Sequence, residues 1–340
     1  MRLLFVGFGT VGQGLAELLI EKKALLARQY GITPIVVGIS DMLKGTVYNP
    51  KGIDLKKALA AVKSGKSLTE LGKPKFEGDA LALIQKAKSD VLLEATYTDI
   101  KTGEPATSHI RAALQKRMHV VTTNKGPLAL HYPKLKRLAD KQKVKFLFEG
   151  TVMSGTPLIN LIRETLAGST ITQIRGILNG TTNYILTRME EGLPYADALK
   201  QAQELGYAEA VPDADVLGWD ALAKVTILAK VFFGATSNPF DYPCEGITGI
   251  TPEAITEAKA AGKRYKLIGR IWREGKAVKA AVAPEQVDLT HPLAGVSGAT
   301  NAVTITTDTL GDVTIVGSGA GRVPTGFSML IDLIRIGAKR

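Results

Sequence analysis

The sequence has few of the residues that build disulfides and metal clusters, and it has no long apolar run. Its 340 residues include one cysteine, Cys244, and four histidines that lack the spacing of metal ligands. A single thiol excludes an intrachain disulfide and a cysteine-based zinc site. No stretch of 18 apolar residues is present to cross a membrane, and the apolar start MRLLFVG meets glycines too early for a signal peptide. These absences favour a cytoplasmic protein without a membrane partner.

The composition is that of a globular protein large enough for two hydrophobic cores, with 45% hydrophobic and 22% charged residues. The net charge of +11 is unevenly spread: residues 111–145 carry ten basic residues and one acid, whereas residues 188–220 carry eight acids and two bases. A basic stretch can bind nucleic acid. These basic residues fall on predicted helix surfaces, so we prefer a solvated face that attracts anionic small molecules, with no nucleic-acid partner.

A glycine motif stands at the N-terminus. The β-rich run LLFVG leads into GFGTVG, and apolar residues at helical spacing follow it. A strand, a G-x-G-x-x-G turn and a helix form the context of a dinucleotide-binding site, in which the helix N-terminus meets the pyrophosphate. The alternative is a glycine-rich turn of an α/β domain without a ligand. The predicted cofactor-binding residues of this turn are Gly7, Phe8, Gly9, Thr10, Val11 and Gly12.

Further strands and helices alternate through the first 150 residues. Strands are predicted at 34–40, 90–96, 119–124 and 144–150, and helices at 79–88, 107–117 and 132–142. This order predicts a doubly wound parallel sheet of the Rossmann type, whose ligands bind beyond the carboxyl ends of the strands. Thr96 and Lys125 follow two such strand ends, so both are predicted to contact the ligand. The alternative for Lys125 is an exposed loop charge.

An acid at the end of the second strand, Asp41, is predicted to bind the adenosine ribose hydroxyls, which favours NAD over NADP. Asp41 stands 29 residues after Gly12, whereas the usual spacing is about 20. A long first helix would absorb the difference. Nearby lysines, Lys44, Lys56 and Lys57, are also within reach of a 2′-phosphate, so NADP stays open.

The rest of the chain indicates an α+β domain for substrate binding and dimerisation. Helices are predicted at 154–168, 183–192 and 194–206, and strands at 170–180, 277–283 and 300–307. We place the dinucleotide domain at 1–134, the second domain at 135–310 and a closing segment at 311–340. That segment holds a glycine turn, GSGAG, and a helix that we expect to pack back on the first domain, with Gly319 near the nicotinamide.

A lysine and an aspartate share one face of an apolar helix that begins near Trp219. Asp220 and Lys224 lie about 40° apart on a helical wheel, among apolar residues. Buried charges are costly unless they are paired. The pair either fixes helix packing or keeps Lys224 ready to exchange a proton with a carbonyl oxygen. Lys230 points away from Lys224 and is expected at the rim or surface.

Together these features predict a dehydrogenase that acts on a small aminated alcohol or aldehyde. Reducing a carbonyl needs a hydride, a proton donor and a group that stabilises the developing oxyanion. The nicotinamide would supply the hydride, and Lys224 and Lys125 suit the other two roles. An acidic loop is available to bind an amino group; its members are Glu209, Asp213, Asp215 and Asp220.

At these residues the sequence resembles the homoserine dehydrogenase family over nearly the whole chain. The motifs that carry the resemblance are GFGTVG, TTNKGPLA (122–129), FEGTVMSGTP (148–157), ILNGTTNYIL (177–186), GYAEAVPDADVLGWDALAK (206–224) and the final GSGAG. No kinase segment precedes them and no regulatory segment follows, which resembles the short, monofunctional form.

The resemblance implies reversible reduction of L-aspartate 4-semialdehyde to L-homoserine with NAD(P)H, a step towards threonine, methionine and isoleucine, by a homodimer. It implies that Lys224 donates and accepts the proton and that Lys125 lies beside substrate and nicotinamide. It implies substrate contacts by Glu209 and Asp220, supported by Asp215, with the backbone of Gly206 near the nicotinamide. It also implies a monovalent cation, Na⁺, at Glu149 and at the carbonyls of Val152, Ser154 and Thr156.

One position departs from the family pattern, and two rival functions remain. Val211 stands before Pro212, where relatives usually have an acid or asparagine, so we expect a local loop change. A phosphorylating semialdehyde dehydrogenase would need a cysteine nucleophile, and Cys244 has no histidine near it in sequence. A non-catalytic nucleotide or nucleic-acid sensor would not need both Lys125 and Lys224.

Overall fold

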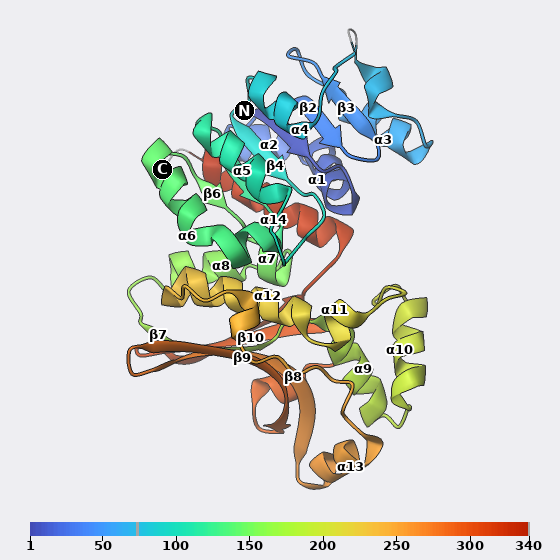
Figure 1. Ribbon diagram of the computed structural model, residues 1–340, viewed down its shortest axis with the longest axis vertical. Helices are drawn as coiled ribbons and strands as arrows, with labels where there is room; N and C mark the ends of the chain where they lie inside the picture. The colour runs from blue at the N-terminus through green and yellow to red at the C-terminus, as the bar shows by residue number, and fades with distance from the viewer. Residues whose placement is uncertain (73–74, 339–340) are drawn as a thin grey trace. The chain divides into compact units, whose positions relative to one another are not determined.

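The computed structural model describes residues 1–72 and 75–338 and divides the chain into two compact units (Figure 1). The first unit combines Met1–Pro157 with Ala320–Arg340, and the second is Leu158–Gly319. The break predicted after residue 134 falls inside a continuous helix, α6 (Lys125–Gln142). The predicted closing segment, 311–340, divides at Gly319, because strand β11 (Gly311–Ser318) pairs within the sheet of the second unit.

The first unit is built on a six-stranded sheet in the order β3-β2-β1-β4-β5-β6. The strands are β1 (Arg2–Val6), β2 (Ile35–Asp41), β3 (Gly45–Tyr48), β4 (Val91–Glu94), β5 (His119–Thr122) and β6 (Phe146–Leu147). All neighbours are parallel except β2 and β3. The central strands are buried on both faces, which explains their continuous apolar runs. The predicted Rossmann-like sheet is confirmed, and β3 adds an antiparallel edge strand that was not predicted.

Helices connect and cover these strands. They are α1 (Thr10–Glu21), α2 (Lys23–Tyr30), α3 (Leu55–Lys63), the 3₁₀ turn η1 (Leu68–Leu71), α4 (Ala80–Lys86), α5 (Ala106–Gln115), α6 and α7 (Gly150–Met153). The long gap between Gly12 and Asp41 is filled by two helices, α1 and α2, instead of one long helix. Gly31, with φ of 66°, ends α2 in a left-handed conformation.

The C-terminal helix α14 (Arg322–Gly337) belongs to the first unit and packs on α1. Glycines make this packing very close. A Cβ at Gly14 of α1 would lie 2.3 Å from the Arg322 carbonyl oxygen, and one at Gly326 would lie 2.6 Å from the Leu15 nitrogen. Met329, Leu330 and Leu333 of α14 join the core under β1. The chain therefore returns to the dinucleotide fold after completing the second unit.

The second unit contains a five-stranded antiparallel sheet in the order β11-β10-β7-β8-β9 (Figure 1). Besides β11, its strands are β7 (Ile171–Ile177), β8 (Lys263–Glu274), β9 (Ala277–Asp288) and β10 (Thr300–Thr307). On one face, Ile177, Ile268 and Ala302 form a core with Leu293 and Ala294. On the other, Gly269 leaves space for Val225 of helix α12 (Trp219–Leu228). The mixed α+β character predicted for this region is confirmed.

The remaining helical segments of the second unit surround this sheet. They are α8 (Leu158–Asn160), η2 (Leu161–Thr165), α9 (Gly180–Glu190), α10 (Tyr195–Glu204), α11 (Asp213–Val216), η3 (Ala229–Phe233), η4 (Pro239–Asp241), α13 (Pro252–Ala260) and η5 (Pro292–Gly295). The helix predicted at 154–168 differs: it starts at Leu158, after Pro157, and continues as a π-helical turn. Among the described residues, no helix is both long and apolar enough to cross a membrane.

Candidate active site

The glycine motif follows β1 and opens α1, and each of its glycines meets a different constraint. Gly7 has φ of 91°, and a Cβ there would lie 2.3 Å from the Ala95 carbonyl oxygen. A Cβ at Gly12 would lie 2.5 Å from the Gly7 carbonyl oxygen, whereas one at Gly9 would meet nothing within 4 Å. The turn is thus closed on the protein side and open at Gly9, beside the N-terminus of α1. That opening suits the approach of a phosphate to the backbone.

The other residues of the turn divide between core and surface. The Phe8 ring is buried and packs edge-on against Phe5, with centroids 5.7 Å apart. Thr10 is exposed and Val11 is partly buried at the start of α1. The Phe8 ring therefore belongs to the core and not to the open side of the turn.

Asp41, at the end of β2, is joined to the same turn. Its Oδ2 accepts a hydrogen bond from the Phe8 nitrogen at 2.8 Å, and its Oδ1 accepts one from Lys44 Nζ at 3.3 Å. Burial acts to raise the pKa of Asp41, but the Phe8 hydrogen bond and the Lys44 charge outweigh it and lower that pKa. The carboxylate therefore stays ionised next to the turn.

A buried acid that the sequence analysis missed organises the neighbouring strand ends. Glu94 closes β4 and is fully buried; its Oε1 accepts from the Thr96 nitrogen at 3.1 Å and from the Thr96 hydroxyl. Its Oε2 accepts from the Thr122 hydroxyl at 3.0 Å. Asn124 Nδ2 donates to the Thr96 carbonyl at 3.2 Å, and its Oδ1 caps α6. Thr96 and the turn that leads to Lys125, the first residue of α6, are thereby held at one edge of the sheet.

The residues predicted to hold a cation form a turn between β6 and Pro157. Glu149 is buried, and its nitrogen donates to Asp332 Oδ2 at 3.0 Å. Val152 belongs to α7, Ser154 has φ of 51°, and Thr156 follows in the same turn. One carboxylate and three backbone carbonyls are hard oxygen donors of the kind that Na⁺ prefers. Within the described part of the chain, no group of three or more His, Cys, Asp and Glu side chains could hold a metal ion.

In the second unit, Lys224 lies in a polar cluster with Asp220, Asp215 and Asn179, which hydrogen bonds link to one another. Its side chain is nearly buried, and Nζ donates to Asp220 Oδ2 at 2.6 Å and to the Leu178 carbonyl oxygen at 2.7 Å. The predicted Asp220–Lys224 pair on one face of a buried helix is therefore present. Gly218, with φ of 85°, turns the chain between α11 and α12, which brings Asp215 close to Asp220.

The two aspartates of this cluster affect each other's ionisation. Burial raises the pKa of Asp215, and the negative charge of Asp220 raises it further. A hydrogen bond from Asn179 and the positive charge of Lys224 act in the opposite direction, without cancelling the rise. The cluster thus holds two carboxylates and one ammonium in a poorly solvated space.

Three other predicted residues lie outside the cluster. Gly206 ends α10 with φ of 73°, and Glu209 is exposed, with its backbone carbonyl accepting from Gln203. Among the described residues, no ion pair joins the Glu209 carboxylate to Lys224, whose carboxylate partner is Asp220. Val211, in the same loop, is 73% exposed. Gly319 follows β11, in a different unit from the GFGTVG turn, and a Cβ there would lie 2.1 Å from the Asn301 amide nitrogen.

Lys230 contradicts its expected surface position. It is 5% exposed, and its Nζ donates to the Thr236 carbonyl oxygen at 3.3 Å. Residues Ala221–Leu228 of α12 are all buried, so the helix has no exposed face on which a wheel could place this residue. Burial lowers the pKa of Lys230, and Asp241 partly offsets this effect.

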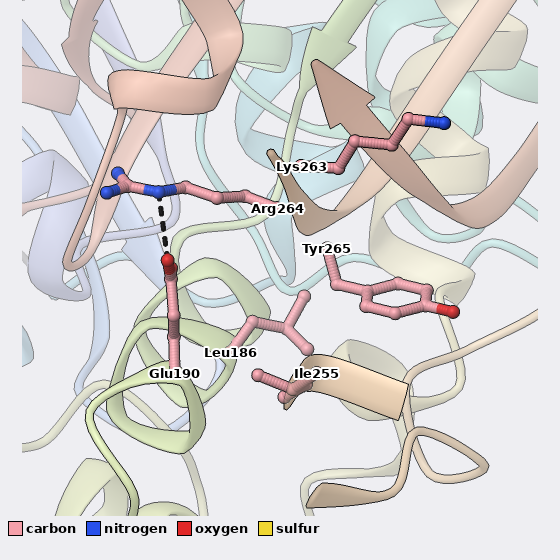
Figure 2. A pocket seen from close by; sticks show the side chains of 6 residues that line it. All are labelled: Leu186, Glu190, Ile255, Lys263, Arg264 and Tyr265. Atoms are coloured by element: carbon pink, nitrogen blue, oxygen red, sulfur yellow. Dashed lines mark ion pairs between the residues drawn. The ribbon is translucent and has the colours of Figure 1, made fainter. Parts of the chain in front are cut away.

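A separate small pocket of the second unit is lined by Leu186, Glu190, Ile255, Lys263, Arg264 and Tyr265 (Figure 2). Figure 2 shows the Arg264–Glu190 ion pair, whose Nε and Oε1 atoms are 2.9 Å apart, closing one side of this pocket. None of the predicted site residues lines it. We therefore assign the chemistry to the Lys224 cluster instead.

The rival based on Cys244 finds no support. Burial raises the pKa of its thiol to about 11, and Sγ donates to the Leu217 carbonyl oxygen at 3.4 Å. A nucleophilic cysteine needs a lowered pKa or an adjacent base. Cys244 is thus a partly buried structural thiol.

A dinucleotide fold and a buried lysine–aspartate pair define an NAD(P)-dependent oxidoreductase. Residues 7–149 match the family model "Homoserine dehydrogenase, NAD binding domain", and residues 157–334 match the model "Homoserine dehydrogenase". The chain belongs to the homoserine dehydrogenase family. Its activity is the reversible NAD(P)H-dependent reduction of L-aspartate 4-semialdehyde to L-homoserine.

Relatives resemble this chain from end to end. An NAD(+)-dependent homoserine dehydrogenase of Pseudomonas canavaninivorans is 45% identical, over 98% of this chain and 96% of its own. A homoserine dehydrogenase of Methanocaldococcus jannaschii is 42% identical, over 99% and 98%. The structure of a hyperthermophilic archaeal homoserine dehydrogenase in complex with NADPH has a TM-score of 0.85 and 30% identity, covering 98% and 97% of the two chains. The sensor alternative is therefore not favoured.

Proposed function

We propose that Lys224 exchanges the proton with the substrate oxygen in this reaction. The observation that carries the proposal is the pair of acceptors, Asp220 and Leu178, that fix its ammonium inside the second unit. An ammonium has three N–H donors, and among the described residues these two acceptors take two of them. The third is directed to a carbonyl oxygen, where Lys224 stabilises the developing charge and then transfers its proton. Asp220 holds the Lys224 side chain in place until that step.

We propose that Asp215 and Asp220, with Glu209 and Gly206 from the exposed loop, bind the amino acid part of the substrate. A net negative cluster attracts the substrate ammonium group. The loop 205–212 carries Glu209 and Val211 at the surface, where closure over a ligand requires little unfolding. Val211 would contribute an apolar contact at this position.

We propose that the GFGTVG turn and the N-terminus of α1 hold the cofactor pyrophosphate, with Thr96 and Lys125 at the nicotinamide end. When bound, the nicotinamide accepts or supplies the hydride. The ionised Asp41 beside the turn disfavours a 2′-phosphate, and a relative of 45% identity is NAD(+)-dependent. Both support a preference for NAD, whereas Lys44 leaves room for some use of NADP.

We also propose that Na⁺ binds at Glu149 and at the carbonyls of Val152, Ser154 and Thr156, and that the enzyme is a cytoplasmic homodimer. The oxygen-only donor set supports the cation. Its binding is tested by thermal unfolding in NaCl and in choline chloride at equal ionic strength. A higher unfolding temperature in NaCl, lost in Glu149→Gln, supports the site. Sedimentation equilibrium tests the dimer.

The decisive experiment follows L-homoserine oxidation with NAD and NADP in parallel, for the wild type and for Lys224→Ala. We expect turnover by the wild type and a loss of about 10³-fold or more in kcat for the variant, with unchanged dinucleotide affinity. Lys230→Ala is the matched control, since it removes a second buried lysine nearby on the chain. Turnover of Lys224→Ala within tenfold of the wild type would reduce Lys224 to a packing residue.

A further inference from the structure

Asn179, between β7 and α9, uses both ends of its amide. It is 4% exposed. Its Oδ1 accepts from the Thr182 nitrogen at 2.9 Å and caps α9. Its Nδ2 donates to Asp215 Oδ1 at 2.6 Å and to Asp220 Oδ2 at 3.1 Å. One side chain therefore fixes the start of a helix and joins the two aspartates of the cluster.

The same short segment also positions Lys224. The residue before Asn179, Leu178, gives its carbonyl oxygen to Lys224 Nζ, and the Asp220 oxygen that accepts from Asn179 is the one that accepts from Lys224. Any shift of Asn179 would consequently move the carboxylate and the lysine together.

An amide suits this place better than any charged side chain. Two neighbouring carboxylates repel each other, and Lys224 offsets only one of the two negative charges. An asparagine donates to both without adding charge, and its other end still accepts from the helix N-terminus. An aspartate would keep the cap but would add a third carboxylate.

We infer that Asn179 is a positioning residue that favours the ionised form of Asp215 and aims Asp220 at Lys224. This inference rests on the proposed role of Lys224. The charged groups that act on Asp215 are Asp220 and Lys224 of α12, while α9 contributes the neutral Asn179 and Thr181. The hydrogen bond from Asn179 is thus the main neutral influence that favours the ionised form of Asp215.

The test compares Asn179→Asp and Asn179→Ser with the wild type. Both variants keep an oxygen that can cap α9, so the unfolding temperature should change little. Both lose the bridging donor, so kcat/KM for L-homoserine should fall about 10- to 100-fold. The acid limb of its pH profile should also move up by about one unit or more, most in Asn179→Asp. The KM for the dinucleotide should stay constant.

A second readout does not depend on activity. Carbon-13 NMR of labelled aspartates gives the titration midpoint of Asp215, which should rise in both variants. Asn183→Asp, the same change one turn later in α9, should leave that midpoint and the acid limb in place. If both variants titrate and turn over like the wild type, or lose only thermal stability, Asn179 is merely a helix cap. A wild type inactive on L-homoserine would defeat the proposed function, while the NMR titration would still decide the role of Asn179.

Discussion

The dinucleotide edge of the first unit and the lysine cluster of the second use opposite means to prepare a site. At the first, backbone conformation shapes the site: Gly7 and Gly12 pack closely against neighbouring backbone, whereas the position of Gly9 is open. At the second, charged side chains hold one another through short contacts, as Lys224 and Asp220 do. The glycine turn should therefore fail on added volume, and the lysine cluster should fail on the loss of a charged partner.

The largest expected effect is the difference in stability between two variants of the glycine turn, each with one added methyl group. Gly7→Ala combines a φ of 91° with a Cβ 2.3 Å from the Ala95 carbonyl oxygen, so we expect a loss of about 3 kcal/mol or more in the free energy of unfolding. Gly9→Ala should fold normally, because nothing lies within 4 Å. It should nevertheless weaken dinucleotide binding at least tenfold by blocking the pyrophosphate. Calorimetry and fluorescence titration measure both effects, and equal stability of the two variants would contradict the geometry.

A buried lysine whose hydrogen-bond partners, among the described residues, are neutral oxygens sharpens the comparison within the second unit. Lys266 Nζ donates to the Val296 carbonyl at 2.6 Å and to Asn183 Oδ1 at 3.2 Å, and burial lowers the pKa of Lys266 to about 8. The unfolded chain then binds more protons between pH 8 and the ordinary value of 10.5. Stability from this group therefore rises with pH across that window, by up to about 3 kcal/mol. The wild type should gain this much relative to Lys266→Met in urea unfolding, and a flat difference would contradict the shift.

An isosteric change at Glu94 tests whether the stability of the strand ends in the first unit depends on a buried negative charge. Glu94→Gln replaces one acceptor oxygen by a donor, against the hydrogen bonds from Thr96 and Thr122. We expect a loss of about 1–3 kcal/mol in unfolding free energy and a higher KM for the dinucleotide. Unchanged values for both would show that this edge is set by the backbone alone.

The smallest expected effect concerns the cofactor choice. Lys44→Ala removes the cation beside Asp41, so the ratio of kcat/KM for NAD to that for NADP should rise by a few-fold. The same ratio measured in Lys63→Ala, an exposed lysine at the end of α3, is the control. A fall in the ratio for Lys44→Ala would show that Lys44 serves NAD rather than NADP.

The features that the sequence analysis found depend on neighbours along the chain, and those that it missed depend on distant partners. The glycine turn, the strand ends and the i,i+4 pair of Asp220 and Lys224 are all local patterns. Asn179, by contrast, stands 36 and 41 residues before the aspartates that it joins. Glu94 stands 28 residues before Thr122, its hydrogen-bond partner on β5.

Errors in the predicted fold have similar physical causes. Strand β8 carries several basic residues and β11 begins and ends near glycines, so neither shows clean alternation, and β3 is only four residues long. The π-helical turns after Leu228 and after Asn160 break the regular period on which a helical wheel depends. The turn after Asn160 interrupts the helix predicted at 154–168, which also starts later, at Leu158. The predicted surface position of Lys230 was wrong because α12 is buried on all sides.

The return of α14 to the first unit has a consequence for the order in which the protein can be made. During synthesis, Met1–Pro157 emerges before Arg322–Gly337, so the face of α1 that receives Gly326 and Leu330 stays bare until α14 has left the ribosome. The segment Leu158–Gly319 has by then been completed, as an insertion in an unfinished fold. A nascent chain stalled before Arg322 would expose this apolar face to chaperones, although most of the dinucleotide sheet would already be present.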